Sequence, residues 1–138
     1  MTEEVNQAGC YAVKLCLNGE YRTLLVDDYF PCLGGTMDSA FSKSRGPELW
    51  VLLLEKAWAK VNLTYENTIT GYASEALRFL TGAPVEFYNH EYHEDIWQQI
   101  QSSDLLNHII CASAGKPNLT GEDYQKLGLV SDHAYAVI

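Results

Sequence analysis

Alternation of apolar and polar positions near the start of the chain predicts a β-hairpin. A first strand over residues 11–17 and a return strand over residues 21–26 flank Asn18-Gly19. Both turn residues accept the positive φ that a type I′ turn requires, so this pair is a strong hairpin signal. We expect one face of the first strand to be buried, the face that carries Val13, Leu15 and Leu17.

The apolar spacing changes to a helical period after residue 46. Pro47 and Glu48 suit a first helical turn. Amides in the first turn have no acceptor within the helix, so proline loses no hydrogen bond there, and the negative charge of glutamate is stabilised by the positive end of the helix dipole. Apolar residues then cover most sides of the helix up to about Val61. A helix of this kind is typically buried, and we expect it to be the central helix of the domain.

Shorter elements fill the remainder of the chain. Gly82 and Pro84 mark the end of one helix, and Thr120 starts a sequence that could cap a single helical turn. The predicted elements are helices over residues 71–80 and 93–102, a strand over residues 108–113, and a closing strand from His133. A hairpin followed by helices and then strands is typical of an α+β fold.

Length and composition indicate one globular domain over residues 1–138. Apolar residues make up 47% of the chain, which excludes a disordered segment. The net charge of −9 argues against a protein that follows nucleic-acid phosphates. No apolar run approaches the ~20 residues of a membrane span. The acidic start, Thr2-Glu3-Glu4, does not resemble a signal peptide.

The four cysteines show neither a Cys-x-x-Cys motif nor a paired spacing. They are Cys10, Cys16, Cys32 and Cys111. Scattered cysteines in a chain without an export signal are typical of reduced thiols in the cytosol, so we expect a cytoplasmic protein.

His133 stands at the head of the closing strand, after residues 128–132, which are typical of a turn. A strand end holds an imidazole on a rigid element while a cleft beside it stays open. The ordinary pKa of histidine, about 6.5, lets it exchange protons near neutrality. A structural histidine at the rim of a sheet is the plainer interpretation.

Cys111 is a first potential partner for His133, because it lies on the preceding predicted strand. A thiolate paired with an imidazolium is a strong nucleophile near pH 7. However, Cys111 belongs to an apolar run, where cysteine usually serves packing, and we do not assign it a catalytic role.

A cluster of imidazoles and carboxylates before the third helix could bind a divalent metal. Its spacing matches no recognised ligand set, and an exposed acidic loop is the simpler interpretation, so we assign no metal ligand. The residues concerned are Glu86, His90, Glu91, His93, Glu94 and Asp95.

A third possibility is that His133 serves a nucleophile outside this chain, and a resemblance supports it. Four stretches, in order and with matching spacing, resemble the calpain family of cysteine proteases. They are residues 18–31, which include Val26-Asp27-Asp28 and end in Pro31; residues 48–60, ELWVLLLEKAWAK; residues 65–82, from Tyr65-Glu66 to Thr81-Gly82; and residues 133–137, HAYAV.

This resemblance implies a papain-like protease core built from two halves. The chain would be the C-terminal, histidine-bearing half, an antiparallel sheet or partial barrel with a buried central helix and two or three shorter helices. The nucleophilic cysteine would lie on the first half, and the domain would be truncated before the asparagine of the triad. His133 is then the one triad residue that the resemblance assigns here, and the family's usual glycine before it is replaced by Asp132.

The resemblance also implies a function, that of an intracellular, calcium-dependent endopeptidase that cleaves protein substrates. His133 would act as general base and acid, and the loop over residues 114–132 would border the cleft. The partners would be the first half of the core and protein substrates, and calcium would serve the full-length protein without a ligand in this chain. The isolated chain would be inactive.

Two other classes of function stay open. The family includes catalytically dead members, so the protein could be a pseudoprotease that serves as a scaffold for protein partners. An unfinished sheet edge at the closing strand could also pair with a second copy, because an open edge is a template for strand addition.

Overall fold

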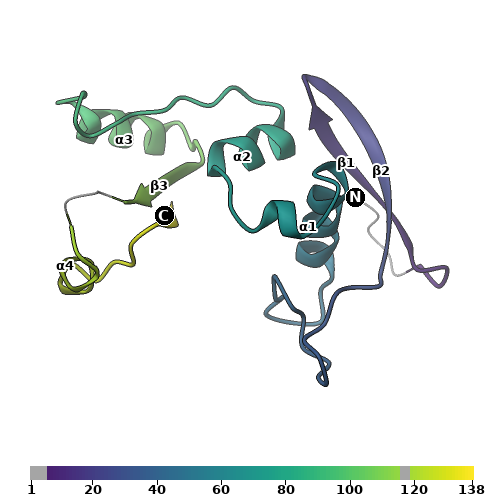
Figure 1. Cartoon of the computed structure of the whole chain (residues 1–138). Helices are drawn as coiled ribbons and strands as arrows, with labels where there is room; N and C mark the ends of the chain where they lie inside the picture. The colour runs from purple at the N-terminus through teal and green to yellow at the C-terminus, as the bar shows by residue number, and fades with distance from the viewer. Residues whose placement is uncertain (1–5, 116–118) are drawn as a thin grey trace. The chain divides into compact units, whose positions relative to one another are not determined.

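A computed structural model describes residues 6–115 and 119–138 of the chain (Figure 1). The chain forms two compact units, which we name the hairpin unit, Met1–Val85, and the histidine unit, Glu86–Ile138. Helices and antiparallel strands are mixed along the chain, as the α+β prediction requires. In the described part of the chain the strands form 2-stranded sheets, with no closed barrel. The prediction of one domain over residues 1–138 stays a prediction.

The elements of the hairpin unit are β1 (Cys10–Leu17), β2 (Glu20–Asp27), α1 (Trp50–Val61), the 3-10 helix η1 (Glu66–Thr68) and α2 (Ala73–Thr81). Those of the histidine unit are α3 (Ile96–Leu105), β3 (Ile110–Ala114), α4 (Gly121–Lys126) and β4 (His133–Val137). No helix among these described elements is both long enough and apolar enough to cross a bilayer.

The predicted hairpin is confirmed. β1 pairs with β2 in antiparallel register, and the turn between them has φ of 51° at Asn18 and 84° at Gly19, as a type I′ turn requires. On β1, Val13 and Leu15 are buried, and Leu17 packs against the same core. Alternation along the strand therefore identified the buried face correctly.

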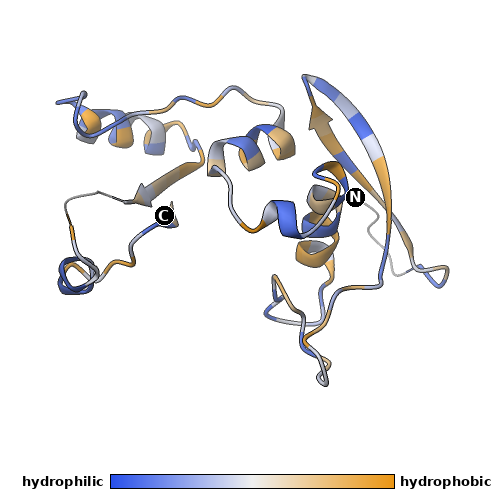
Figure 2. Ribbon diagram, in the orientation of Figure 1, coloured by the Kyte–Doolittle hydropathy of each residue, from blue (hydrophilic) through white to orange (hydrophobic). Residues whose placement is uncertain are grey.

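α1 packs against this hairpin through Leu53 and Ala57, and Figure 2 shows that both the helix and the strands carry apolar residues. The core of the unit joins residues of β1, β2, α1 and α2, namely Tyr11, Val13, Leu15, Val26, Leu53, Ala57 and Phe79. Trp58 of α1 meets Phe79 of α2 edge to face, with ring centroids 4.6 Å apart. The prediction of a helix buried on most sides is confirmed, because ten of its twelve residues are buried or half-buried, and the exposed ones are Trp50 at its first position and Lys60 near its last.

The ends of the helices differ from the prediction by a few residues. α1 begins at Trp50 rather than Pro47, and Leu49 precedes it without a side-chain cap, so no polar residue marks this start in the sequence. α2 ends where Gly82 predicts, because Gly82 takes the left-handed conformation at φ 68° and its amide bonds the Arg78 carbonyl. α3 covers residues 96–105 rather than 93–102.

In the histidine unit, β3 and β4 form an antiparallel pair, with Ala114 opposite His133 and Ile110 opposite Val137. α4 lies between these strands in sequence and begins with the predicted cap. The Asp123 amide donates to the Thr120 hydroxyl, and the Asp123 carboxylate accepts from the Thr120 amide at 3.0 Å.

Candidate active site

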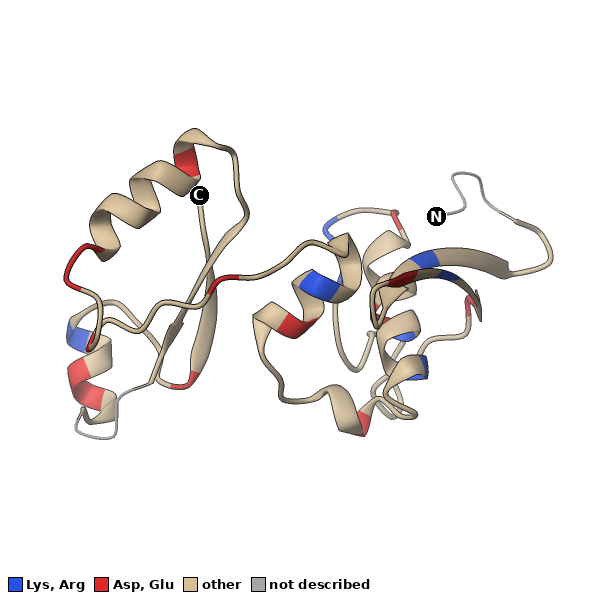
Figure 3. Cartoon of the chain, turned by 90° about the horizontal axis from the view of Figure 1, so that it is seen from above, with Lys and Arg blue, Asp and Glu red and all other residues tan. Residues whose placement is uncertain are grey.

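His133 is the first residue of β4, and its side chain is exposed. Sequence reasoning placed this residue at a strand head, and the structure confirms that position. The histidine unit around it is acidic, with eight Asp or Glu residues and two Lys residues in its sequence. Figure 3 shows the charges of its described residues on both helices and loops.

The chain reaches His133 through a closely bonded turn. At the end of α4 the Gly128 amide bonds the Gln125 carbonyl and the Leu129 amide bonds the Tyr124 carbonyl, with Gly128 at φ 71°. This pattern is a Schellman motif, in which a left-handed residue closes a helix. It sets the direction in which the chain leaves α4 toward Val130.

Tyr135, two residues after His133 on the same face of β4, holds this turn from the strand. The Val130 amide donates to the Tyr135 hydroxyl at 2.7 Å, and the hydroxyl lies 3.5 Å from the Val130 carbonyl oxygen. The Tyr135 ring also meets the His133 ring edge to face, with centroids 4.9 Å apart and an angle of 82° between the planes. Sequence reasoning did not assign Tyr135 any role. Its hydroxyl bonds a backbone amide, and a backbone partner leaves no pattern of side chains in the sequence.

Asp132 has φ of 52°, in the left-handed region that favours glycine. This backbone conformation gives a physical reason why a glycine suits the position before the histidine. Aspartate tolerates the conformation better than most residues, and here its carboxylate accepts a hydrogen bond from the Ser131 hydroxyl at 3.0 Å. Asp132 is therefore part of the turn geometry.

Cys111 does not face His133 across the hairpin. Cys111 lies opposite Ala136, whereas His133 lies opposite Ala114. Residues directly opposite each other share a face, and successive residues alternate faces. Cys111 is three positions from Ala114, so its side chain projects from the face of the sheet opposite to that of His133. The strand register excludes this pair as a nucleophile and base within the hairpin.

Two residues of the candidate metal cluster, Glu86 and His93, contact Tyr88. The Tyr88 hydroxyl donates to the Glu86 carboxylate at 2.6 Å, and this bond raises the pKa of Tyr88. The His93 ring packs edge to face on Tyr88 at 5.4 Å. Across residues 6–115 and 119–138, no three His, Cys, Asp or Glu side chains come together in a way that could hold a metal ion.

Part of the loop expected to border a cleft, residues 116–118, lies outside the described residues. Its last part, residues 128–132, forms the turn described above, and Gly115 lies beside Asp132, since a Cβ there would be 3.2 Å from the Asp132 carboxylate.

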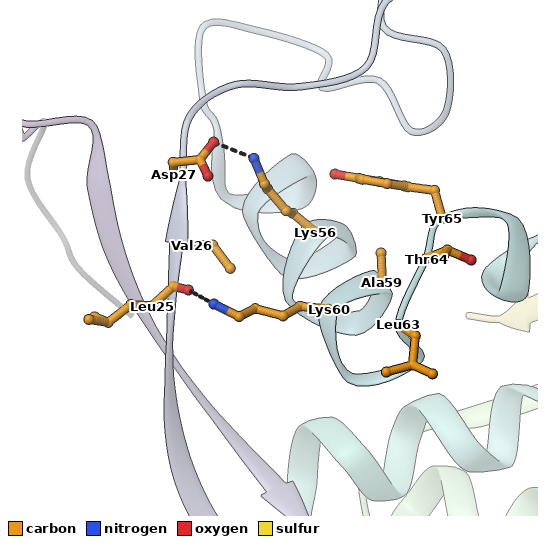
Figure 4. A pocket seen from close by; sticks show the side chains of 9 residues that line it. All are labelled: Leu25, Val26, Asp27, Lys56, Ala59, Lys60, Leu63, Thr64 and Tyr65. Carbon is orange, nitrogen blue, oxygen red and sulfur yellow. Dashed lines mark hydrogen bonds and ion pairs between the residues drawn. The ribbon is translucent and has the colours of Figure 1, made fainter.

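The hairpin unit contains a pocket of about 300 Å³ between β2, α1 and the segment that follows α1 (Figure 4). Lys56 bonds the Asp27 carboxylate and the Tyr29 carbonyl, and Lys60 donates to the Leu25 carbonyl at 2.7 Å. The hydrogen bond from Lys56 lowers the pKa of Asp27. The lining residues offer no thiol or imidazole, so this pocket does not supply the cysteine–histidine pair that a cysteine protease uses.

Tyr65 lines the same pocket, and its hydroxyl points toward the side that Lys56 and Asp27 form (Figure 4). Burial of the hydroxyl, and then the negative charges of Glu55 and Asp27, raise the pKa of Tyr65 to about 12. This buried oxygen has no hydrogen-bond partner among the described residues, although the ring stacks on Phe41 at 4.9 Å. No sequence signal indicated an unpaired group here.

The comparisons with known proteins agree on one family. The family model described as calpain family cysteine protease matches residues 1–138. The calpain-type cysteine protease ADL1 of Oryza sativa subsp. japonica is 30% identical over 146 residues, which cover 100% of this chain and 7% of that protein. Calpain-7 of Homo sapiens is 33% identical over 98% of this chain, and the calpain-1 catalytic subunit of Rattus norvegicus is 33% identical over 94%. The chain spans 17% and 18% of these two relatives.

Proposed function

The chain belongs to the calpain family of cysteine proteases, and we propose that His133 is the general base and general acid of a calpain-like endopeptidase that cleaves protein substrates. The observation that carries this proposal is the position of His133. It is an exposed imidazole at the first residue of a strand, inside the HAYAV sequence that resembles the family's histidine motif.

The nucleophile in this proposal is a cysteine of the longer protein, outside these 138 residues. His133 takes the proton of that thiol, and the thiolate attacks the carbonyl carbon of the substrate peptide. The imidazolium then gives its proton to the leaving amine as the peptide bond breaks. Water, deprotonated by the same imidazole, hydrolyses the acyl-thioester and frees the enzyme.

The histidine unit would supply the histidine-bearing part of a papain-like core in this scheme. The 138-residue chain alone would not cleave peptides, because the proposed nucleophile lies outside it and the strand register turns Cys111 away from His133. A calcium requirement and an intracellular location remain proposals for the longer protein. The described residues bring no set of metal ligands together, so we assign no calcium ligand to this chain and derive no step through calcium.

Peptide cleavage by the longer protein tests this role. We expect His133→Ala to lower kcat/KM by about 10²–10⁴-fold, the usual contribution of a positioned general base. His108→Ala is the matched control, because His108 is an exposed histidine of the same unit just before β3, and it should stay within about twofold of the parent. Equal cleavage by the parent and His133→Ala would refute the role of His133. Absence of any cysteine-dependent cleavage by the parent would instead favour a pseudoprotease scaffold.

A further inference from the structure

We infer that Tyr135 is a positioning residue for His133, which fixes both the imidazole and the turn that leads to it. The inference rests on the proposed function, because positioning matters for catalysis only if His133 is the base. Its evidence is the pair of contacts that Tyr135 makes, one through its ring and one through its hydroxyl.

The ring contact restricts the imidazole. His133 is exposed and lies at the end of a two-stranded sheet. The residue opposite it on β3 is Ala114, whose side chain is too small to fix the position of the imidazole. An exposed side chain in such a place samples several χ1 rotamers. The edge-to-face contact with Tyr135 at 4.9 Å favours those in which the two rings meet.

The hydroxyl contact restricts the backbone. Val130 is exposed, so water could satisfy its amide if the tyrosine hydroxyl were absent. The bond at 2.7 Å therefore serves geometry more than it serves stability, because it ties the turn to the same side chain that contacts the imidazole. Between these two contacts lies Asp132, whose left-handed backbone aims the chain into β4.

The Tyr135 side chain thus holds both the imidazole and the turn that precedes it in one arrangement. Catalysis gains from such preorganisation, because a base that already lies in the reactive geometry loses less freedom at the transition state. The effect belongs to kcat, since Tyr135 need not touch the substrate.

Two variants separate the two contacts. Tyr135→Phe keeps the ring and removes the hydroxyl, whereas Tyr135→Ala removes both. Tyr92→Phe is the matched control, because Tyr92 is a 78% exposed tyrosine of the same unit. We expect kcat of the longer protein to fall about 2–4-fold in Tyr135→Phe and about tenfold in Tyr135→Ala, with KM changed by less than about twofold.

An NMR measurement on the 138-residue chain gives a readout that does not need activity. The Tyr135 ring current should shift the His133 imidazole protons away from their random-coil positions in the parent, in Tyr135→Phe and in Tyr92→Phe. In Tyr135→Ala these resonances should return toward random-coil values, while the Ile110 and Val137 amides keep the shifts of the paired strands.

The outcomes distinguish this inference from the proposed function. Unchanged His133 resonances in Tyr135→Ala would overturn the ring contact. Lost resonance shifts together with an unchanged kcat, in a protein that His133→Ala inactivates, would overturn the positioning role and leave the catalytic role of His133 intact. Full activity of His133→Ala would remove both.

Discussion

Substitution of Gly82 by alanine tests how the hairpin unit is packed, because Gly82 combines two separate constraints. Its φ is 68°, which costs an L-residue about 1 kcal/mol after the smaller entropy of the unfolded chain is included. A Cβ at this position would also lie 2.8 Å from the Tyr21 hydroxyl and 3.1 Å from the Cys16 sulfur. The first of these distances is too short for a carbon contact.

Tyr21 cannot withdraw without a further loss, because its hydroxyl donates to the Thr81 carbonyl at 2.6 Å. Overpacking of this kind costs about 1–3 kcal/mol. We therefore expect Gly82→Ala to lower the free energy of unfolding by about 2–4 kcal/mol in total. Urea denaturation, followed by tryptophan fluorescence in a Trp97→Phe background, would measure it, since Trp50 and Trp58 then report on the hairpin unit alone.

Gly19→Ala is the matched control, because Gly19 has φ of 84° and a Cβ there would meet nothing within 4 Å. It should cost about 1 kcal/mol, the conformational part alone. In a Tyr21→Phe background, where the hydroxyl is absent, the cost of Gly82→Ala should decrease by about 1 kcal/mol. Equal costs for Gly82→Ala and Gly19→Ala would refute the packing argument.

Three further predictions concern single contacts. Tyr65→Phe should raise the free energy of unfolding by about 1 kcal/mol in urea denaturation, because it removes a buried hydroxyl without a partner among the described residues; a loss of stability would reveal a bound water or ligand. Lys56→Met should destabilise the hairpin unit at pH 7. Lys56 lowers the pKa of Asp27 below 3.8, so the stabilisation from their ion pair is present above the unfolded pKa and lost as pH falls through the folded pKa. The difference between Lys56→Met and the parent should therefore narrow between pH 5 and pH 2, and a constant difference would contradict the ion pair. Asp132→Gly should change the free energy of unfolding by less than about 1 kcal/mol, whereas Asp132→Val should lower it by about 2 kcal/mol, because a β-branched residue fits the left-handed region poorly. Equal thermal unfolding midpoints for the two variants would contradict this.

The features that the sequence predicted well are those that neighbouring residues determine. Asn18-Gly19 defines the turn by its own backbone preferences, Thr120 and Asp123 form a cap within one helical turn, and Gly82 ends α2. The strand that begins at His133 follows from its alternation and from the turn before it. In each case the information lies within a few residues.

The features that could not be predicted from the sequence depend on contacts between residues far apart in the chain or on hydrogen bonds to backbone groups. Trp50, the first residue of α1, is half exposed although the helix that follows it is mostly buried, and the all-round apolar pattern does not distinguish it from the buried positions. The bond from Val130 to Tyr135 has no sequence signature, since any residue could supply the amide. The separation of Cys111 from His133 follows from strand register, and a shift of one residue would have reversed it.

The pH dependence of alkylation at the nucleophilic cysteine of the longer protein tests the central claim most directly, because it detects the pairing of His133 with a thiol before any substrate is bound. Iodoacetamide should react with a thiolate whose apparent pKa lies well below the ordinary value of about 8.5, since an imidazolium stabilises the anion. In His133→Ala the profile should move up toward about 8.5, whereas His108→Ala should leave it in place. An alkylation profile that is the same in the parent and in His133→Ala would contradict the claim that this imidazole serves the nucleophile.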